Sequence, residues 1–139
     1  MSESTAPLSS VSLRADHHRL DQLFSDLCNC ARVGTWHEVE EMWPSFAGEL
    51  EAHMRYEEEH LFASFAETPD GMDRTAELRA EHAALRQLVD AVGLDVELHT
   101  LRAESIESLV AALRAHAARE ERVFYPWLAL RELARAETR

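Results

Sequence analysis

The chain has 139 residues, of which 46% are hydrophobic and only four each are glycine and proline, a composition that favours long helices over a sandwich or barrel. Its formal net charge of −12 is repelled by phosphate backbones and anionic lipid surfaces, so we expect no nucleic-acid and no membrane partner. The opening residues MSESTAPLSS lack the pattern of a signal peptide, and no apolar run of about 18 residues follows, so we expect a cytoplasmic protein.

Apolar residues recur at helical spacing in four segments of the chain. The first two helices are expected over about 10–31 and 36–66, and the third and fourth on either side of a connection near 99–102. No segment shows the sustained alternation of a strand. Four amphipathic helices with short links predict an all-α, antiparallel up-down-up-down four-helix bundle, which forms a single domain at 10–136 after a disordered lead at 1–9.

The expected helix ends rest on a few residues. Ser9 or Ser10 can cap the first helix, and Thr35 with Glu38 forms a possible capping box for the second. Pro44 lies inside the predicted second helix, so that helix is either kinked there or preceded by a short turn that ends there.

The sequence repeats the unit His…His-x-x-x-Glu. His53 and Glu57 lie four residues apart in HMRYEE, and the pattern returns as HAAREE. Each copy is preceded by a histidine embedded in an apolar stripe, in DHHRLDQLF and in EHAALRQL. The six candidate metal ligands are His17, His53, Glu57, His82, His116 and Glu120.

These residue types point to a metal because they fall on the apolar stripes of the predicted helices. A buried carboxylate without a partner costs several kcal/mol, and the chain contains no lysine to compensate it. Histidine and glutamate four residues apart project side by side from one helix face, so the imidazole can bind one metal and the carboxylate can bridge to a second. Imidazole and carboxylate ligands suit iron, and also zinc or manganese, so a two-metal site in the bundle core is predicted.

Neighbouring acidic and basic residues have more than one interpretation. Glu58 and Glu121 follow the two candidate bridging glutamates, and we interpret them as solvated or helix-pairing, with Glu121 the stronger rival ligand. Arg86, four residues after His82, either extends outward or places a positive charge near the metals.

The remaining polar and aromatic residues are assigned to the core or the surface. A tyrosine such as Tyr56 or Tyr125 is expected in the core or at its rim, with a hydrogen bond to a bridging ligand as the alternative. Cys28 and Cys30 are interpreted as partly buried helix-end cysteines, with a redox or accessory metal element as the alternative. Four histidines lie off the stripes and are expected at the surface, namely His18, His37, His60 and His99.

From about Leu13 to Leu130 the chain resembles the hemerythrin-like, or HHE cation-binding, domain family, through DHHRLDQLF, HMRYEEEHLF, EHAALRQL and HAAREERVFYP in that order. The resemblance implies an antiparallel four-helix bundle around a non-heme di-iron centre with an oxo or hydroxo bridge, with Mn/Fe as the alternative metal pair. It also implies that the four stripe histidines are terminal ligands and that Glu57 and Glu120 bridge the metals.

The chain departs from the oxygen-carrying members of this family. They have a second histidine where this chain has Arg86, and they carry His-x-x-x-x-Asp where this chain has Glu120 and Glu121. The four-His, two-Glu pattern is similar to bacterial iron–sulfur-repair proteins that handle nitric oxide, and to members that remove peroxide. Fewer histidines leave more open coordination positions, which favours reaction with O₂, NO or H₂O₂ over reversible oxygen carriage.

Whether the protein turns over a substrate stays open at this stage. The leading expectation is a di-iron protein that binds or reacts with a small oxidant or diatomic gas at a carboxylate-bridged site. The alternatives are an O₂, NO or iron sensor, an iron-storage module without turnover, and a metal-free helical interaction protein.

Overall fold

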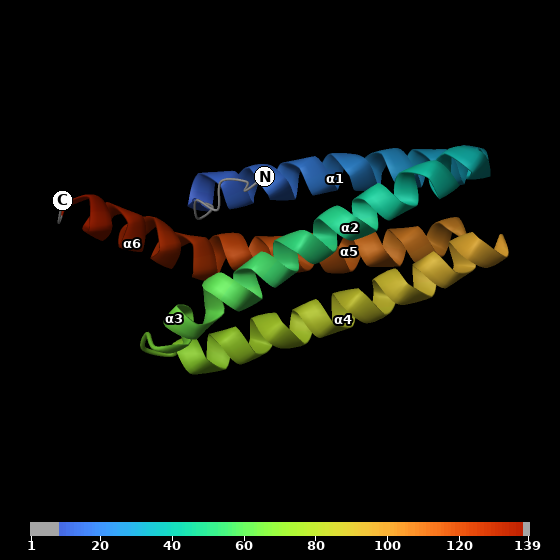
Figure 1. The fold of residues 1–139 in the computed structure, drawn as a ribbon. Coiled ribbons are helices and arrows are strands. Elements are labelled where there is room, and N and C mark those ends of the chain that lie inside the picture. Colours follow the sequence, from blue (N-terminus) through green and yellow to red (C-terminus); the bar gives the residue numbers. More distant parts are fainter. Residues whose placement is uncertain (1–8, 138–139) are drawn as a thin grey trace, which may run out of the picture.

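The computed structural model describes residues 9–137, and four long helices dominate it (Figure 1). They are α1 (Ser10–Val33), α2 (Trp36–His60), α4 (Gly71–Leu98) and α5 (Ala103–Arg119). Consecutive helices in this series pack side by side and run antiparallel, and α5 packs back against α1. Residues 9–137 contain no strand. The predicted all-α four-helix bundle is therefore confirmed, whereas all but the last residue of the predicted disordered lead lies outside the described residues.

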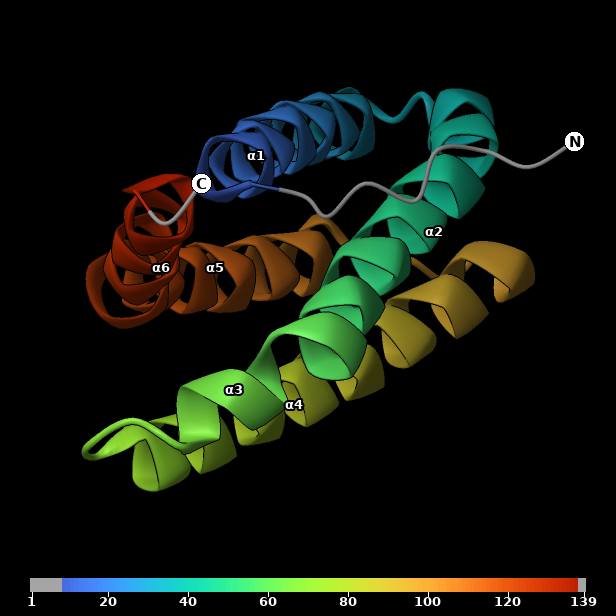
Figure 2. The same ribbon diagram turned by 60° about the vertical axis from the view of Figure 1, so that its left-hand side comes forward.

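Three shorter elements complete the fold. The helix α3 (Phe62–Ala66) precedes the turn into α4, and the π-helical segment η1 (Glu120–Phe124) joins α5 to α6 (Tyr125–Glu137). The last helix changes direction and extends beyond the start of α1, as the two ribbon views show (Figures 1 and 2). None of the helices in residues 9–137 is both long and apolar enough to cross a membrane.

The predicted serine cap of α1 is confirmed, but the predicted capping box of α2 is wrong. The Ser12 backbone N–H donates to the Ser9 hydroxyl at 3.1 Å, so Ser9 is the N-cap of α1. Gly34 ends α1 in the left-handed conformation (φ 80°), which glycine adopts without steric cost. At the next helix the Thr35 hydroxyl instead donates to the carbonyl of Cys30 (3.1 Å), so it caps the end of α1 and not the start of α2.

The second helix is shorter than predicted. It ends at His60 because Leu61 leaves the helical conformation (φ −124°, ψ −37°), and the chain then resumes as α3. This break turns Phe62 and Phe65 into the core, where their exposed fractions are 0% and 2%. Pro44 lies within α2, so the helix passes through it, with no preceding turn that ends there.

The apolar core is divided into two clusters. The larger one fills the end of the bundle that holds the α1–α2 and α4–α5 turns, and includes Leu20, Phe24, Phe46, Leu50, Leu85, Ile106 and Leu113. The smaller one lies towards α3 and α6, and consists of Leu13, Leu61, Phe62, Phe65, Leu78, Phe124, Tyr125 and Leu128. Each long helix has one buried or nearly buried histidine where the larger cluster gives way to the smaller one. A polar layer therefore crosses the core of the bundle.

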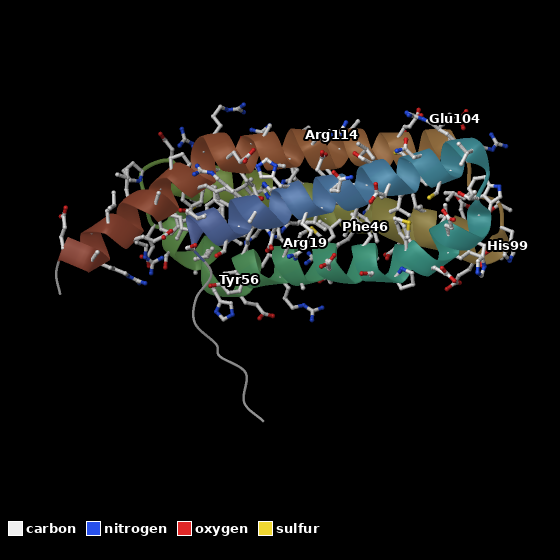
Figure 3. The ribbon with its side chains drawn as sticks, turned by 90° about the horizontal axis from the view of Figure 1, so that it is seen from above. Arg19, Phe46, Tyr56, His99, Glu104 and Arg114 are labelled. Carbon is white, nitrogen blue, oxygen red and sulfur yellow. The ribbon has the colours of Figure 1, made fainter. Side chains whose placement is uncertain are left out.

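Surface side chains surround this core. In Figure 3 Arg114 lies on the outer side of α5, and His99 lies at the end of the bundle opposite α6. The four histidines predicted to lie at the surface are all exposed, as expected: His18, His37, His60 and His99.

Candidate metal centre

The polar layer brings the six predicted ligands together. Each of the four long helices supplies one histidine, α2 also supplies Glu57, and η1 begins with Glu120. Both glutamates have an exposed fraction of 0%, as does His82. This convergence follows from helical spacing, because residues four apart in α2 and across the α5–η1 junction project from the same face.

The six residues form two overlapping groups, in each of which the potential ligand atoms lie within 4.8 Å of one another. These groups of potential ligands are called the first and second cluster from here on, as distinct from the apolar core clusters. The first cluster contains His17, His53, Glu57 and Glu120. The second cluster contains Glu57, His82, His116 and Glu120. The two glutamates belong to both clusters, so their carboxylates lie between the two pairs of histidines.

Imidazole nitrogens face each other and the carboxylates across this layer. In the second cluster the Nε2 atoms of His82 and His116 lie 3.1 Å apart. In the first cluster Nε2 of His17 lies 3.0 Å from Oε1 of Glu120. Nε2 of His53 lies 3.3 Å from Oε2 of Glu57, so Nε2 of every candidate ligand histidine is turned inward.

Carboxylates outside the layer hold the opposite nitrogen of three of these histidines. Glu58 and Glu81 accept from Nδ1 of His82 and His116, each at 2.7 Å, and Asp16 lies 3.3 Å from Nδ1 of His53. An ionised carboxylate only accepts, so these contacts assign the proton to Nδ1 and leave the Nε2 lone pair facing inward. In the second cluster the two Nε2 atoms face each other at 3.1 Å, so a proton or a metal cation between them is needed to avoid repulsion of their lone pairs.

Arginines surround the outer carboxylates. Arg86 donates two hydrogen bonds to Glu58, at 2.8 and 2.9 Å, and Arg119 pairs with Glu81. Arg19 lies 3.3 Å from Asp16. These pairs neutralise the outer acids, so the charge of the inner carboxylates is left to be compensated within the layer. Arg86 thus extends neither freely into solvent nor into the clusters, because Glu58 and Glu51 hold its guanidinium.

The two inner carboxylates lack the usual partners. Among residues 9–137 neither is paired with an arginine, and Oε1 of Glu57 and Oε2 of Glu120 have no hydrogen-bond donor. The nearest imidazole nitrogens, of His82 and His116, lie 3.3 and 3.2 Å from these oxygens, but not in hydrogen-bond geometry. Such buried acceptors with lone pairs to spare fit metal ligation.

In the metal-free protein, protonated imidazoles balance the negative charge of the buried carboxylates. Burial and the charge of Glu120 raise the pKa of Glu57. Burial alone would lower the pKa of His53, but hydrogen bonds to Asp16, Glu120 and Glu57 outweigh it and raise that pKa to about 12. Protons on imidazoles therefore supply positive charge to the buried carboxylates in the metal-free state.

Tyr125 also belongs to this layer, and it makes the hydrogen bond to a candidate bridging glutamate that the sequence predicts as the alternative role of a tyrosine. Its hydroxyl donates to Oε2 of Glu57 at 2.9 Å and lies 2.9 Å from Nε2 of His17 and 3.2 Å from Oε1 of Glu120. Burial and the charges of Glu120 and Glu57 raise the pKa of this phenol, which stays protonated. The sequence does contain a sign that Tyr125 lies near the candidate ligands. It follows His116 by nine residues, as Phe62 follows His53 in the first half of the repeat.

Other candidates fall outside the two clusters. Glu121 follows Glu120 but belongs to neither. Cys28 and Cys30 are free thiols, half-buried in the last part of α1, and Cys30 donates to Glu38 at 3.3 Å. Neither cysteine is among the groups of potential metal ligands in residues 9–137.

Comparison with known proteins agrees with this geometry. A family model for the hemerythrin HHE cation binding domain matches residues 10–128, which include all four long helices and all six clustered residues. No curated protein and no solved structure matches the chain significantly. Since the match spans most of the 139 residues, the chain belongs to the hemerythrin HHE cation-binding domain family.

Proposed function

We propose that this protein holds two iron ions, one in each cluster, with Glu57 and Glu120 as shared ligands, and that it reacts with a small oxidant or diatomic gas. The observation that supports the proposal is that two groups of four potential ligands have both glutamates in common. His17 and His53 would hold one ion, and His82 and His116 the other. Their nitrogen and oxygen ligands suit iron, and manganese with iron remains the alternative pair.

Iron in this setting would supply redox chemistry and open coordination positions to a ligand such as O₂, NO or H₂O₂. The protein residues would set the conditions for it. Glu58, Glu81 and Asp16 hold three imidazoles with Nε2 inward, and the apolar residues of the two core clusters exclude water on either side. The Tyr125 hydroxyl, within hydrogen-bond distance of both shared carboxylates, can donate a hydrogen bond to either of them.

Arg86 supports reactivity over reversible oxygen carriage. It stands one turn after His82, where the oxygen-carrying members of the family, from which this chain departs, have a further histidine. Its guanidinium is bound to Glu51 and Glu58, so it adds no ligand at this position. The ion held by His82 and His116 is therefore expected to keep a position open.

Elemental analysis tests the metal assignment. Wild-type protein loaded anaerobically with Fe²⁺ is expected to hold two iron ions per chain, and Glu57→Ala and Glu120→Ala are each expected to lose at least one. Full iron retention in both variants would contradict the assignment. Turnover is tested separately, by adding many equivalents of H₂O₂ or NO to the loaded protein: steady consumption supports the reactive function, and its absence favours sensing or storage.

A further inference from the structure

The two halves of the chain repeat the contacts around the ligands as well as the ligands themselves. In each half, the acid immediately before the first histidine holds Nδ1 of the second histidine. In the first half Asp16 lies 3.3 Å from His53, and in the second half Glu81 lies 2.7 Å from His116. The repeat thus extends to the outer carboxylates.

A second pair of outer contacts is present on one side only. Glu58, the residue after the bridging glutamate of the first half, lies 2.7 Å from Nδ1 of His82 in the other half. The equivalent of Glu58 is Glu121, and the equivalent of His82 is His17. Yet Nδ1 of His17 is buried and has no hydrogen-bond partner among the described residues. One of the four ligand histidines therefore lacks the carboxylate that orients the other three.

Two local differences between the halves explain the missing contact. The π-helical segment η1 contains Glu121, and its wider turn rotates this residue away from the place that Glu58 has in regular α-helix. Charge acts in the same direction. Arg86 holds Glu58 against His82, whereas the position equivalent to Arg86 is Asp21, a carboxylate that cannot donate to Glu121 and is itself paired with Arg114.

From this asymmetry we infer that the two clusters bind metal with different affinities, the second cluster more tightly, and that Glu58 is the positioning residue that makes the difference. The inference rests on the proposed function, in which both clusters hold metal. A carboxylate on Nδ1 fixes the ring and makes Nε2 a stronger ligand, and loss of such a contact weakens metal binding by about 10- to 100-fold. In the first cluster the cation also has to compete with the Tyr125 hydroxyl, which lies among the ligand atoms.

The test is a titration of the metal-free full chain with Zn²⁺, followed through the ring resonances of its histidines by NMR. The first equivalent is expected to shift the resonances of His82 and His116, and the second those of His17 and His53. Two neighbouring cations repel each other, so unequal steps would also arise in identical clusters. The identity of the histidines that respond first therefore decides, and equal half-occupancy of both pairs at one equivalent would overturn the inference.

Two matched variants test the role of Glu58. Glu58→Gln is expected to weaken the first binding step about 10- to 100-fold, so that the two clusters bind Zn²⁺ with similar affinities. Glu121→Gln, the equivalent change in the other half, is expected to leave both steps unchanged. Equal effects of the two variants would overturn the role of Glu58. A wild-type chain that binds no Zn²⁺ and no Fe²⁺ would overturn the proposed function as well, whereas two equal sites would contradict only the present inference.

Discussion

Phe62 and Tyr125 occupy equivalent positions in the two halves of the chain, and each ring packs against a histidine of the other half. Phe62 follows His53 by nine residues, and its ring centroid lies 5.3 Å from that of His82. Tyr125 follows His116 by nine residues, and its centroid lies 5.2 Å from that of His17. The two rings differ by one hydroxyl, which lies beside the histidines of the first cluster and donates to Glu57, a residue of both clusters. Tyr125 therefore gives the two otherwise similar clusters different chemistry.

Removal of this hydroxyl should affect the metal-free protein most. Tyr125→Phe keeps the ring but takes the donor from Glu57, whose carboxylate is fully buried. We expect the free energy of unfolding of chelator-treated protein to fall by about 1–3 kcal/mol, the cost of an unsatisfied buried acceptor. Urea unfolding measures this change.

The metal-loaded form provides the control for the same variant. A cation bound to Glu57 would compensate the carboxylate in place of the hydroxyl, so the loss of stability should be smaller when both clusters are filled. Equal losses in the two forms would mean that the hydroxyl acts independently of the charge of Glu57.

The convergence of the six candidate ligands could be predicted from the sequence because it depends on local spacing. His53 and Glu57 are one helical turn apart in a continuous helix, and apolar stripes place such pairs in the core without knowledge of the neighbouring helices. The same reasoning worked for His17 and His82, which lie on regular stripes of α1 and α4. Bundle topology then required only short links between amphipathic helices.

The place of Tyr125 could not be read from α-helical spacing. In a regular helix a residue five positions after Glu120 is rotated by about 140° from it. Here the Tyr125 backbone N–H donates to the carbonyl of Glu120, an i→i+5 bond that closes a π-turn and brings the two side chains to one face. The interpretation of Glu58 as a helix-pairing residue is confirmed, since it binds His82 and Arg86 of α4, but its partners could not be named from the sequence. Its partner His82 is on another helix, so the contact exists only after the bundle has formed.

The stability of the metal-free protein should fall as pH rises above neutrality. Burial opposes protonation of His82, but hydrogen bonds to Glu120 and Glu57 raise its pKa to about 9, from the ordinary value of 6.5. A group whose pKa is raised on folding stabilises the folded state fully below its unfolded pKa and loses this effect as pH approaches the folded pKa. We therefore expect the Tm of chelator-treated protein to decrease between pH 6.5 and 9.

Metal should reverse this pH dependence. A cation competes with protons for Nε2, so its binding strengthens as pH rises through the same range. The Tm of the metal-loaded protein, measured in parallel by circular dichroism with excess metal, is expected to increase or stay level between pH 6.5 and 9. Parallel profiles for the loaded and metal-free forms would contradict the assignment of these histidines as ligands.

Two glycines should respond to alanine in opposite ways. Gly71 begins α4, and a Cβ there would collide with the carbonyl of Phe65 and the hydroxyl of Thr68 in the preceding turn. We expect Gly71→Ala to lower the free energy of unfolding by about 3 kcal/mol. Gly48 is exposed inside α2 with open space around it, and Gly48→Ala should raise stability by about 0.5–1 kcal/mol. Urea unfolding of both variants checks the pair, and unchanged stability in Gly71→Ala would show that the turn before α4 can move.

Arg86 should influence metal affinity through Glu58 and have little effect on stability. Its guanidinium makes two hydrogen bonds to Glu58, while its side chain remains 34% exposed. Arg86→Met keeps the aliphatic stem but removes the charge that holds Glu58 against His82. Because partly exposed ion pairs contribute little, we expect a loss of about 1 kcal/mol at most in stability.

The expected effect of Arg86→Met on Zn²⁺ affinity, measured by competition with a chelator, is a weakening of up to about 10-fold, at the low end of changes around metal ligands. Arg32→Met is the matched control, because Arg32 forms a similar pair with Glu107 on α5, and neither residue belongs to the two clusters. Its metal affinity should equal that of the wild type. In a Glu58→Gln background the effect of Arg86→Met should largely disappear, because both changes remove the same support from His82. Additive effects in the double variant would instead mean that Arg86 acts on the clusters through its own charge, independently of Glu58.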